Sequence, residues 1–171
     1  MIRIAICDDD ESLVFNNKRI IGEYVKKNKE IVDIEEYSNG EFLLADIQEG
    51  EYFDLILLDI EMPHKDGMEI APQIKKYLPH ALIVFVTSHL KYAVDSFALS
   101  IFRYVPKQEI QPRLEQALND AFKYIKLQQN DIYTIQTQNR FEKIFLNLNY
   151  SRWRYQLWKN PYSYCVFNRF T

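Results

Sequence analysis

The chain has 171 residues, of which 47% are hydrophobic and 26% are charged, and its formal net charge is −3. This length and apolar content predict one complete domain with a buried core and a shorter remainder, and two cysteines are too few for a disulfide framework. Because Asp8, Asp9 and Asp10 interrupt any apolar segment at the start, and no apolar run approaches membrane-spanning length, we expect a soluble, cytoplasmic protein.

Short apolar strands alternate with amphipathic stretches along the first 126 residues. Residues 2–7, 55–58 and 81–86 are almost wholly apolar, as expected of strands that are buried on both faces. Residues 32–35 and 101–105 mix polar and apolar positions, which is typical of strands at the edges of a sheet. One helix is expected after each strand. The first follows Asp10, the second begins at a capping box formed by Ser38 and Glu41, and the third runs from the Asp66–Gly67 turn to about Tyr77. The fourth covers about Leu90–Ala98, and the fifth begins near Pro112.

Five strands alternating with five helices predict an α/β fold with a doubly wound parallel sheet. The three apolar strands belong inside the sheet and the two mixed strands at its edges, which favours the strand order 2-1-3-4-5. Pro72 falls within the third helix and is expected to kink it or to delay its start. Cys7, at the end of the first strand, is expected to be a small core residue.

Polar side chains follow four of the predicted strands. Asp8 and Asp9 come after the first strand, Asp59 after the third, Thr87 after the fourth and Lys107 after the fifth. Because the carboxyl ends of parallel strands form one edge of the sheet, we expect these side chains to meet there. Asp59 is then a candidate nucleophile for phosphoryl transfer, with the Thr87 hydroxyl and the Lys107 ammonium group as partners for the phosphoryl oxygens.

A divalent cation would relieve the repulsion among the carboxylates of Asp8, Asp9 and Asp59. An oxygen-only ligand set, completed by the backbone carbonyl of Glu61, favours Mg²⁺. Each of these residues also has an ordinary explanation, since acids after a strand can be solvated or can cap a helix, and Lys107 can be a surface lysine. Their joint occurrence at the carboxyl ends of four strands favours the chemical interpretation.

Residues 1 to about 126 resemble the receiver domain of bacterial two-component response regulators, a flavodoxin-like fold. The resemblance rests on the acidic pair Asp8-Asp9, on Asp59 in Leu-Leu-Asp-Ile-Glu-Met-Pro, on Asp66-Gly67, on Thr87 in Phe-Val-Thr-Ser-His, and on Lys107. It implies that a histidine kinase phosphorylates Asp59, with Mg²⁺ bound near Asp9, Asp59 and the carbonyl of Glu61.

The resemblance also implies a switch and a dimer surface. Thr87 would move toward the phosphoryl group and Tyr104 would turn inward, although an edge-strand aromatic that simply packs is the ordinary alternative. Homodimers would form through the fourth helix and the fifth strand. One departure affects the site, since the family has lysine followed by proline, whereas Pro106 precedes Lys107 here and Gln108 follows it. The loop that carries Lys107 is therefore expected to differ.

Two other classes of protein remain open at this point. A phosphatase of the haloacid-dehalogenase type would use Asp8 as its nucleophile and Asp10 as its acid, and the chain shows no evident insertion for a cap. A flavodoxin-like binding module without chemistry would leave the pairing of Asp59 with Lys107 unexplained. The receiver interpretation is preferred, and it predicts a signalling switch that catalyses only its own phosphorylation and dephosphorylation.

Residues 127–171 differ in composition from the rest of the chain. They contain two acidic and six basic residues, whereas residues 1–126 contain 22 acidic and 15 basic residues. A strand over Ile132–Thr137, a turn at residues 138–140 and a strand from Ile144 to Tyr150 resemble the opening of the LytTR-type DNA-binding domain. Because such a domain is considerably longer, we expect a truncated output segment, poor order or docking for the last 21 residues, and absent or weak DNA binding.

Overall fold

The computed structural model describes residues 1–63, 66–88, 101–129, 132–137 and 140–145. The chain forms two compact units, Met1–Phe122 and Lys123–Thr171. The helix predicted at about Leu90–Ala98 lies outside the described residues, as do the last 21 residues. Within the described part of the chain, no helix is both long enough and apolar enough to cross a membrane.

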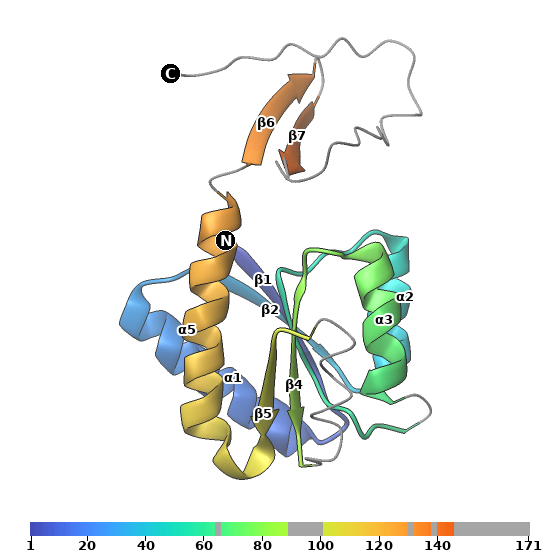
Figure 1. Ribbon diagram of the computed structural model, residues 1–171, viewed down its shortest axis with the longest axis vertical. Helices are drawn as coiled ribbons and strands as arrows, with labels where there is room; N and C mark the ends of the chain where they lie inside the picture. The colour runs from blue at the N-terminus through green and yellow to red at the C-terminus, as the bar shows by residue number, and fades with distance from the viewer. Residues whose placement is uncertain (64–65, 89–100, 130–131, 138–139, 146–171) are drawn as a thin grey trace. The chain divides into compact units, whose positions relative to one another are not determined.

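Strands and helices alternate through most of the described chain (Figure 1). The elements are β1 (Ile2–Cys7), α1 (Glu11–Asn28), β2 (Val32–Tyr37), α2 (Gly40–Glu49), β3 (Leu55–Leu58), α3 (Gly67–Tyr77), β4 (Leu82–Thr87), β5 (Arg103–Pro106), a 3-10 turn (Lys107–Glu109), α5 (Ile110–Gln129), β6 (Ile132–Thr137) and β7 (Arg140–Phe145).

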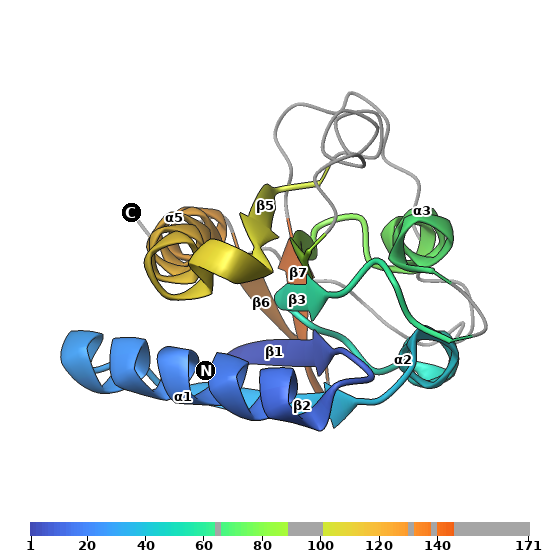
Figure 2. The same ribbon diagram turned by 90° about the horizontal axis from the view of Figure 1, so that it is seen from below.

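The sheet of the first unit has the order β2-β1-β3-β4-β5 with all neighbouring strands parallel, which confirms the predicted α/β topology. Helices α1 and α5 cover one face of the sheet, and α2 and α3 cover the other (Figure 2). Every residue of β3 and β4 is buried, whereas β2 is mostly half-buried. The apolar strands therefore lie inside the sheet and the mixed strands at its edges, as predicted.

Amphipathic spacing predicted the buried face of α5 correctly. Its core residues Leu114, Leu118, Ala121, Phe122 and Ile125 are all buried. These positions recur every three or four residues, so they share one side of the helix. Cys7 is also buried in the core, as predicted.

Several predicted boundaries were wrong. Asn39, and not Ser38, caps α2, because its side chain accepts the Phe42 amide hydrogen bond at 3.0 Å. Pro72 does not delay α3, which begins five residues earlier at Gly67. The fifth strand begins at Arg103, two residues later than predicted, and ends with Pro106 at an edge of the sheet, where proline is tolerated.

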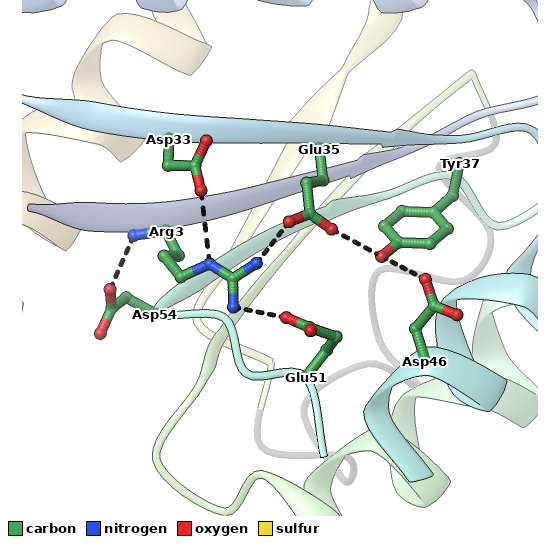
Figure 3. Close-up of polar contacts among 7 residues, drawn as sticks. All are labelled: Arg3, Asp33, Glu35, Tyr37, Asp46, Glu51 and Asp54. Carbon is green, nitrogen blue, oxygen red and sulfur yellow. Dashed lines mark hydrogen bonds and ion pairs between the residues drawn. The ribbon is translucent and has the colours of Figure 1, made fainter. Parts of the chain in front are cut away.

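A network of charged side chains binds the amino-terminal ends of the strands (Figure 3). The Arg3 guanidinium group in β1 pairs with Glu35 in β2, with Glu51 at 2.6 Å and with Asp33 at 3.5 Å. The Arg3 backbone amide also donates to Asp54 Oδ2 at 2.8 Å. We call Arg3, Asp33, Glu35 and Glu51 the Arg3 cluster. Its contacts join residues far apart in the sequence and hold the register of β1, β2 and the start of β3.

The second unit contains an antiparallel pair, β6 and β7. Strand β6 has the predicted bounds, Ile132–Thr137. Strand β7 begins at Arg140, which was predicted to lie in the turn, and pairs that residue with Thr137. The predicted second strand therefore starts four residues too late, and its remainder after Phe145 lies outside the described residues.

Candidate functional site

Three polar side chains are buried where the central strands end. Asp8 is 3% exposed, Asp59 is 5% exposed and Thr87 is fully buried. The Asp59 amide donates to the Cys7 carbonyl at 2.9 Å, which continues the pairing of β3 with β1 by one residue. Asp59 and Asp8 are therefore set side by side by the sheet itself, at its carboxyl edge.

Lys107 joins the two buried carboxylates. Its Nζ atom lies 2.7 Å from Asp59 Oδ2 and 2.9 Å from Asp8 Oδ2. The side chain begins the 3-10 turn that follows β5, and it is 13% exposed. The order Pro106-Lys107-Gln108 thus does not turn the lysine away from the site. Although this loop was expected to differ from that of the family, the Lys107 side chain still contacts both carboxylates.

Burial and charge act against each other in this group. Burial raises the pKa of the Asp8 carboxyl above its ordinary value, although the Lys107 ammonium group and the Asp10 amide both favour its ionised form. Burial opposes the charge of Lys107, but hydrogen bonds to Asp59 and Asp8 outweigh it and raise the pKa of the lysine. Lys107 therefore favours the ionised form of Asp8, and the two carboxylates beside Lys107 favour its charged form.

Asp9 completes a group of oxygen ligands. One carboxylate oxygen from each of Asp8, Asp9 and Asp59 can be chosen so that all three lie within 4.8 Å of one another. Asp9 is exposed, so the group opens to solvent on that side. Three hard oxygen donors beside a single lysine leave an excess of negative charge, and this donor set fits Mg²⁺. We call Asp8, Asp9, Asp59 and Lys107 the strand-end cluster.

Asp10 serves a different purpose from its two neighbours. Its Oδ1 atom accepts hydrogen bonds from the Ser12 amide at 2.8 Å and the Ser12 hydroxyl at 2.6 Å, so that it caps α1. These bonds hold the pKa of Asp10 below its ordinary value. A carboxylate committed to the start of a helix is poorly placed to act as the acid of a haloacid-dehalogenase-type phosphatase.

The segment after Asp59 folds back onto it. Asp59 Oδ1 accepts a hydrogen bond from the Ile60 amide at 2.7 Å, and the Gly67 amide donates to the Ile60 carbonyl at 2.8 Å. A Cβ atom at Gly67 would lie only 2.2 Å from the Asp59 carbonyl oxygen. Only glycine therefore allows α3 to begin so close to Asp59. The Asp66-Gly67 pair was recognised in the sequence, but this close approach was not predicted.

The two predicted switch residues lie on neighbouring strands at this edge. Thr87 ends β4 and is the register partner of Pro106, which directly precedes Lys107. Tyr104 in β5 is partly buried and packs against the hydrophobic core. Burial and then the charge of Asp59 raise the pKa of the Tyr104 phenol. The structure therefore brings Asp8, Asp9, Asp59 and Lys107 together, with Thr87 and Tyr104 on the adjacent strands.

Comparison with known proteins agrees with this arrangement. Residues 4–119 match the model of the response regulator receiver domain. The sensory transduction protein LytR of Staphylococcus epidermidis is 35% identical over 115 residues, which cover 67% of this chain and 44% of that protein. The transcriptional regulatory protein NatR of Bacillus subtilis is 44% identical over 61 residues, covering 36% of this chain and 26% of that protein.

Solved structures share the fold. A receiver domain protein from Clostridium thermocellum is 25% identical, with a TM-score of 0.64 over 74% of this chain and 98% of that one. The response regulatory domain of mrkE from Klebsiella pneumoniae has a TM-score of 0.66 at 24% identity, over 74% of this chain and 99% of that one. The chain spans less than half the length of the LytR relative. By its match over residues 4–119, the chain belongs to the response regulator receiver domain family.

Proposed function

We propose that this chain is the phosphoacceptor of a two-component signal transduction system and that Asp59 receives the phosphoryl group. The observation that carries the proposal is the strand-end cluster, in which Asp59 is buried beside Lys107 and within reach of two further carboxylates. Its place at the carboxyl edge of a parallel sheet is where α/β proteins bind ligands.

The proposed donor is a phosphohistidine of a sensor kinase. An Asp59 carboxylate oxygen would attack phosphorus in line with the histidine nitrogen, so that the O–P bond forms as the N–P bond breaks. Lys107 would then move from the Asp59 carboxylate to a phosphoryl oxygen, and the Thr87 hydroxyl would donate to another. The histidine leaves as imidazole after taking up a proton, so the chain itself needs no general acid.

Mg²⁺ is the proposed cofactor. Asp8, Asp9, Asp59 and the backbone carbonyl of Glu61 would hold it, and when bound it supplies positive charge to the phosphoryl oxygens. The role of the chain is to keep these oxygen ligands together against their mutual repulsion. Lys107 performs part of that task before phosphorylation, because its single positive charge contacts both buried carboxylates and reduces their repulsion.

Phosphorylation is proposed to change the surface that the protein presents to its partners, and not to start the turnover of a substrate. Phosphorylation would shift an existing equilibrium in which Thr87 moves toward the phosphoryl group and Tyr104 turns inward. Homodimerisation through the fourth helix and β5 is part of the proposal, although that helix lies outside the described residues. Catalysis is limited to the protein's own phosphorylation and dephosphorylation.

The output is proposed to be transcription regulation in the cytoplasm. We assign residues 1–126 to the receiver domain and residues 127–171 to a partial LytTR-like segment. Support for this output comes from the hairpin of β6 and β7 and from relatives whose names describe transcriptional regulators. For residues 127–171 we expect weak or absent sequence-selective DNA binding, which a gel-shift titration tests.

Intact-protein mass spectrometry tests the phosphoacceptor proposal. The full chain is incubated with phosphoramidate and Mg²⁺, and the expected result is one labile phosphoryl adduct that is absent when Mg²⁺ is chelated. Asp9→Asn, which alters a proposed Mg²⁺ ligand but not the nucleophile, is expected to slow adduct formation. A chain that forms no adduct under any of these conditions would contradict the proposal.

A further inference from the structure

Met62 connects the segment after Asp59 to the strand that carries Asp8. It lies three residues after Asp59, and its side chain is buried, with 9% exposed. Its Sδ atom accepts a hydrogen bond from the Cys7 thiol, with 3.6 Å between the two sulfur atoms. Since Cys7 ends β1 and directly precedes Asp8, this side chain bridges the two strand ends that supply carboxylates.

The tip of the Met62 side chain fits beside α2. A Cβ atom added at Gly40 would lie 3.4 Å from Met62 Cε and 1.9 Å from Ile70 Cδ1. The missing side chain at Gly40 therefore leaves room that Met62 and Ile70 fill together. We call Cys7, Gly40 and Ile70 the Met62 socket, and it joins β1, α2 and α3 around one side chain.

Met62 differs from its two neighbours in the chain by being buried. Glu61 and Pro63 on either side are exposed, whereas Met62 is part of the main hydrophobic core. Glu61 is thus held between two core side chains, Ile60 and Met62, and Met62 is the one on the side of the Glu61 carbonyl. Glu61 is directly bonded to it, so its carbonyl moves with Met62.

We propose that Met62 is a positioning residue for the cation site, and that its side chain in the socket fixes the Glu61 carbonyl relative to Asp8 and Asp59. The inference rests on the proposed function, because it requires that Mg²⁺ binds these groups. Mg²⁺ demands near-ideal octahedral geometry, so a small displacement of one ligand lowers affinity. Groups that orient ligands typically contribute about 10- to 100-fold to metal affinity.

Calorimetric titration of the unphosphorylated full chain with Mg²⁺ tests the inference. Met62→Ala empties the socket, and we expect a dissociation constant about tenfold above that of the wild type. Met62→Leu keeps most of the volume, and we expect it to restore the affinity nearly fully. Met68→Ala is the matched control, because Met68 packs against the same core from α3 but does not lie in the segment after Asp59.

Phosphorylation kinetics distinguish positioning from general loosening of the core. For Met62→Ala, half-maximal phosphorylation is expected to need more Mg²⁺, while the rate at saturating Mg²⁺ stays near that of the wild type. Met68→Ala is expected to lower the midpoint of thermal unfolding without changing the Mg²⁺ requirement. Equal Mg²⁺ affinity in the wild type and Met62→Ala would overturn the inference and leave the proposed function standing.

Two further outcomes are decisive. A wild-type chain that binds no Mg²⁺ contradicts the proposed function itself, and this inference falls with it. In case Met62→Ala does not fold, Cys7→Ala opens the socket from β1 without shortening Met62, and a severalfold weaker Mg²⁺ affinity is expected. Unchanged affinity in Cys7→Ala would then overturn the inference.

Discussion

Two groups of charged side chains occupy opposite ends of the same sheet, and each contains one cation and three carboxylates. In the Arg3 cluster the carboxylate side chains are 36–48% exposed, and each contacts the guanidinium group directly. In the strand-end cluster the side chains of Asp8 and Asp59 are 2% and 6% exposed, and both share one ammonium group.

The type of cation explains much of the difference. The Arg3 guanidinium group spreads its charge over a plane that contacts three carboxylates and lies 4.9 Å from the Tyr52 ring centroid and 5.1 Å from that of Phe53. Its bonding capacity is used within the fold. Lys107 is a point charge. It contacts Asp8 and Asp59, and one carboxylate oxygen from each of these residues and from Asp9 lies within 4.8 Å of the other two. The first cluster is a structural joint, and the second keeps an excess of negative charge that a ligand can use.

Removing the lysine is expected to have the largest effect on stability. Lys107→Ala leaves Asp8 and Asp59 buried without their cation, and the expected loss in the free energy of unfolding is about 3–5 kcal/mol without Mg²⁺. Added Mg²⁺ is expected to restore part of this loss. Urea unfolding with and without Mg²⁺ measures both effects, and Lys27→Ala on the exposed face of α1 is the control. Equal stability of Lys107→Ala and wild type would contradict the account of this cluster.

Acidification is expected to weaken Mg²⁺ binding at the strand-end cluster. The pKa of Asp8 in the folded chain is raised, so the carboxylate that binds Mg²⁺ is present above that value and is lost as the pH falls through it. The loss therefore begins at higher pH than the ordinary aspartate value of about 3.9 implies. Titrations with Mg²⁺ across this range check it, and an affinity that stays constant down to the ordinary range would refute it.

Changing the other cation is expected to have the smallest effect. Arg3→Lys keeps the charge but loses the planar fork and the contact with two aromatic rings, and the expected loss of stability is about 1 kcal/mol. Phosphorylation and Mg²⁺ affinity are expected to stay at wild-type levels, because the Arg3 cluster lies at the amino-terminal ends of the strands. A large change in the phosphorylation rate of Arg3→Lys would show that the two ends are coupled.

The sequence predicted the strand-end cluster and missed the Arg3 cluster, for a physical reason. Asp8, Asp59 and Lys107 each follow a strand and Thr87 ends one, and parallel topology alone brings such positions to one edge. The contact of Arg3 with Glu51 spans 48 positions and depends on side-chain directions that leave no local pattern.

Other features were predicted wrongly or not at all, because two local choices were similar or because close packing decided the outcome. Ser38 and Asn39 are both good helix caps, and the choice between them depends on where the chain leaves β2. Arg140 fits a turn by composition, but pairing with Thr137 places it in β7. The need for glycine at position 67 follows from the path of the backbone near Asp59, which composition does not reveal.

Chemical mapping of the phosphorylated residue tests the central claim most directly. Borohydride reduces an aspartyl phosphate to homoserine, so peptide sequencing by mass spectrometry after phosphorylation and reduction identifies the acceptor. The account predicts homoserine at position 59 in the wild type and none in Asp59→Asn. Homoserine at position 8, or at any carboxylate of the Arg3 cluster, would contradict it.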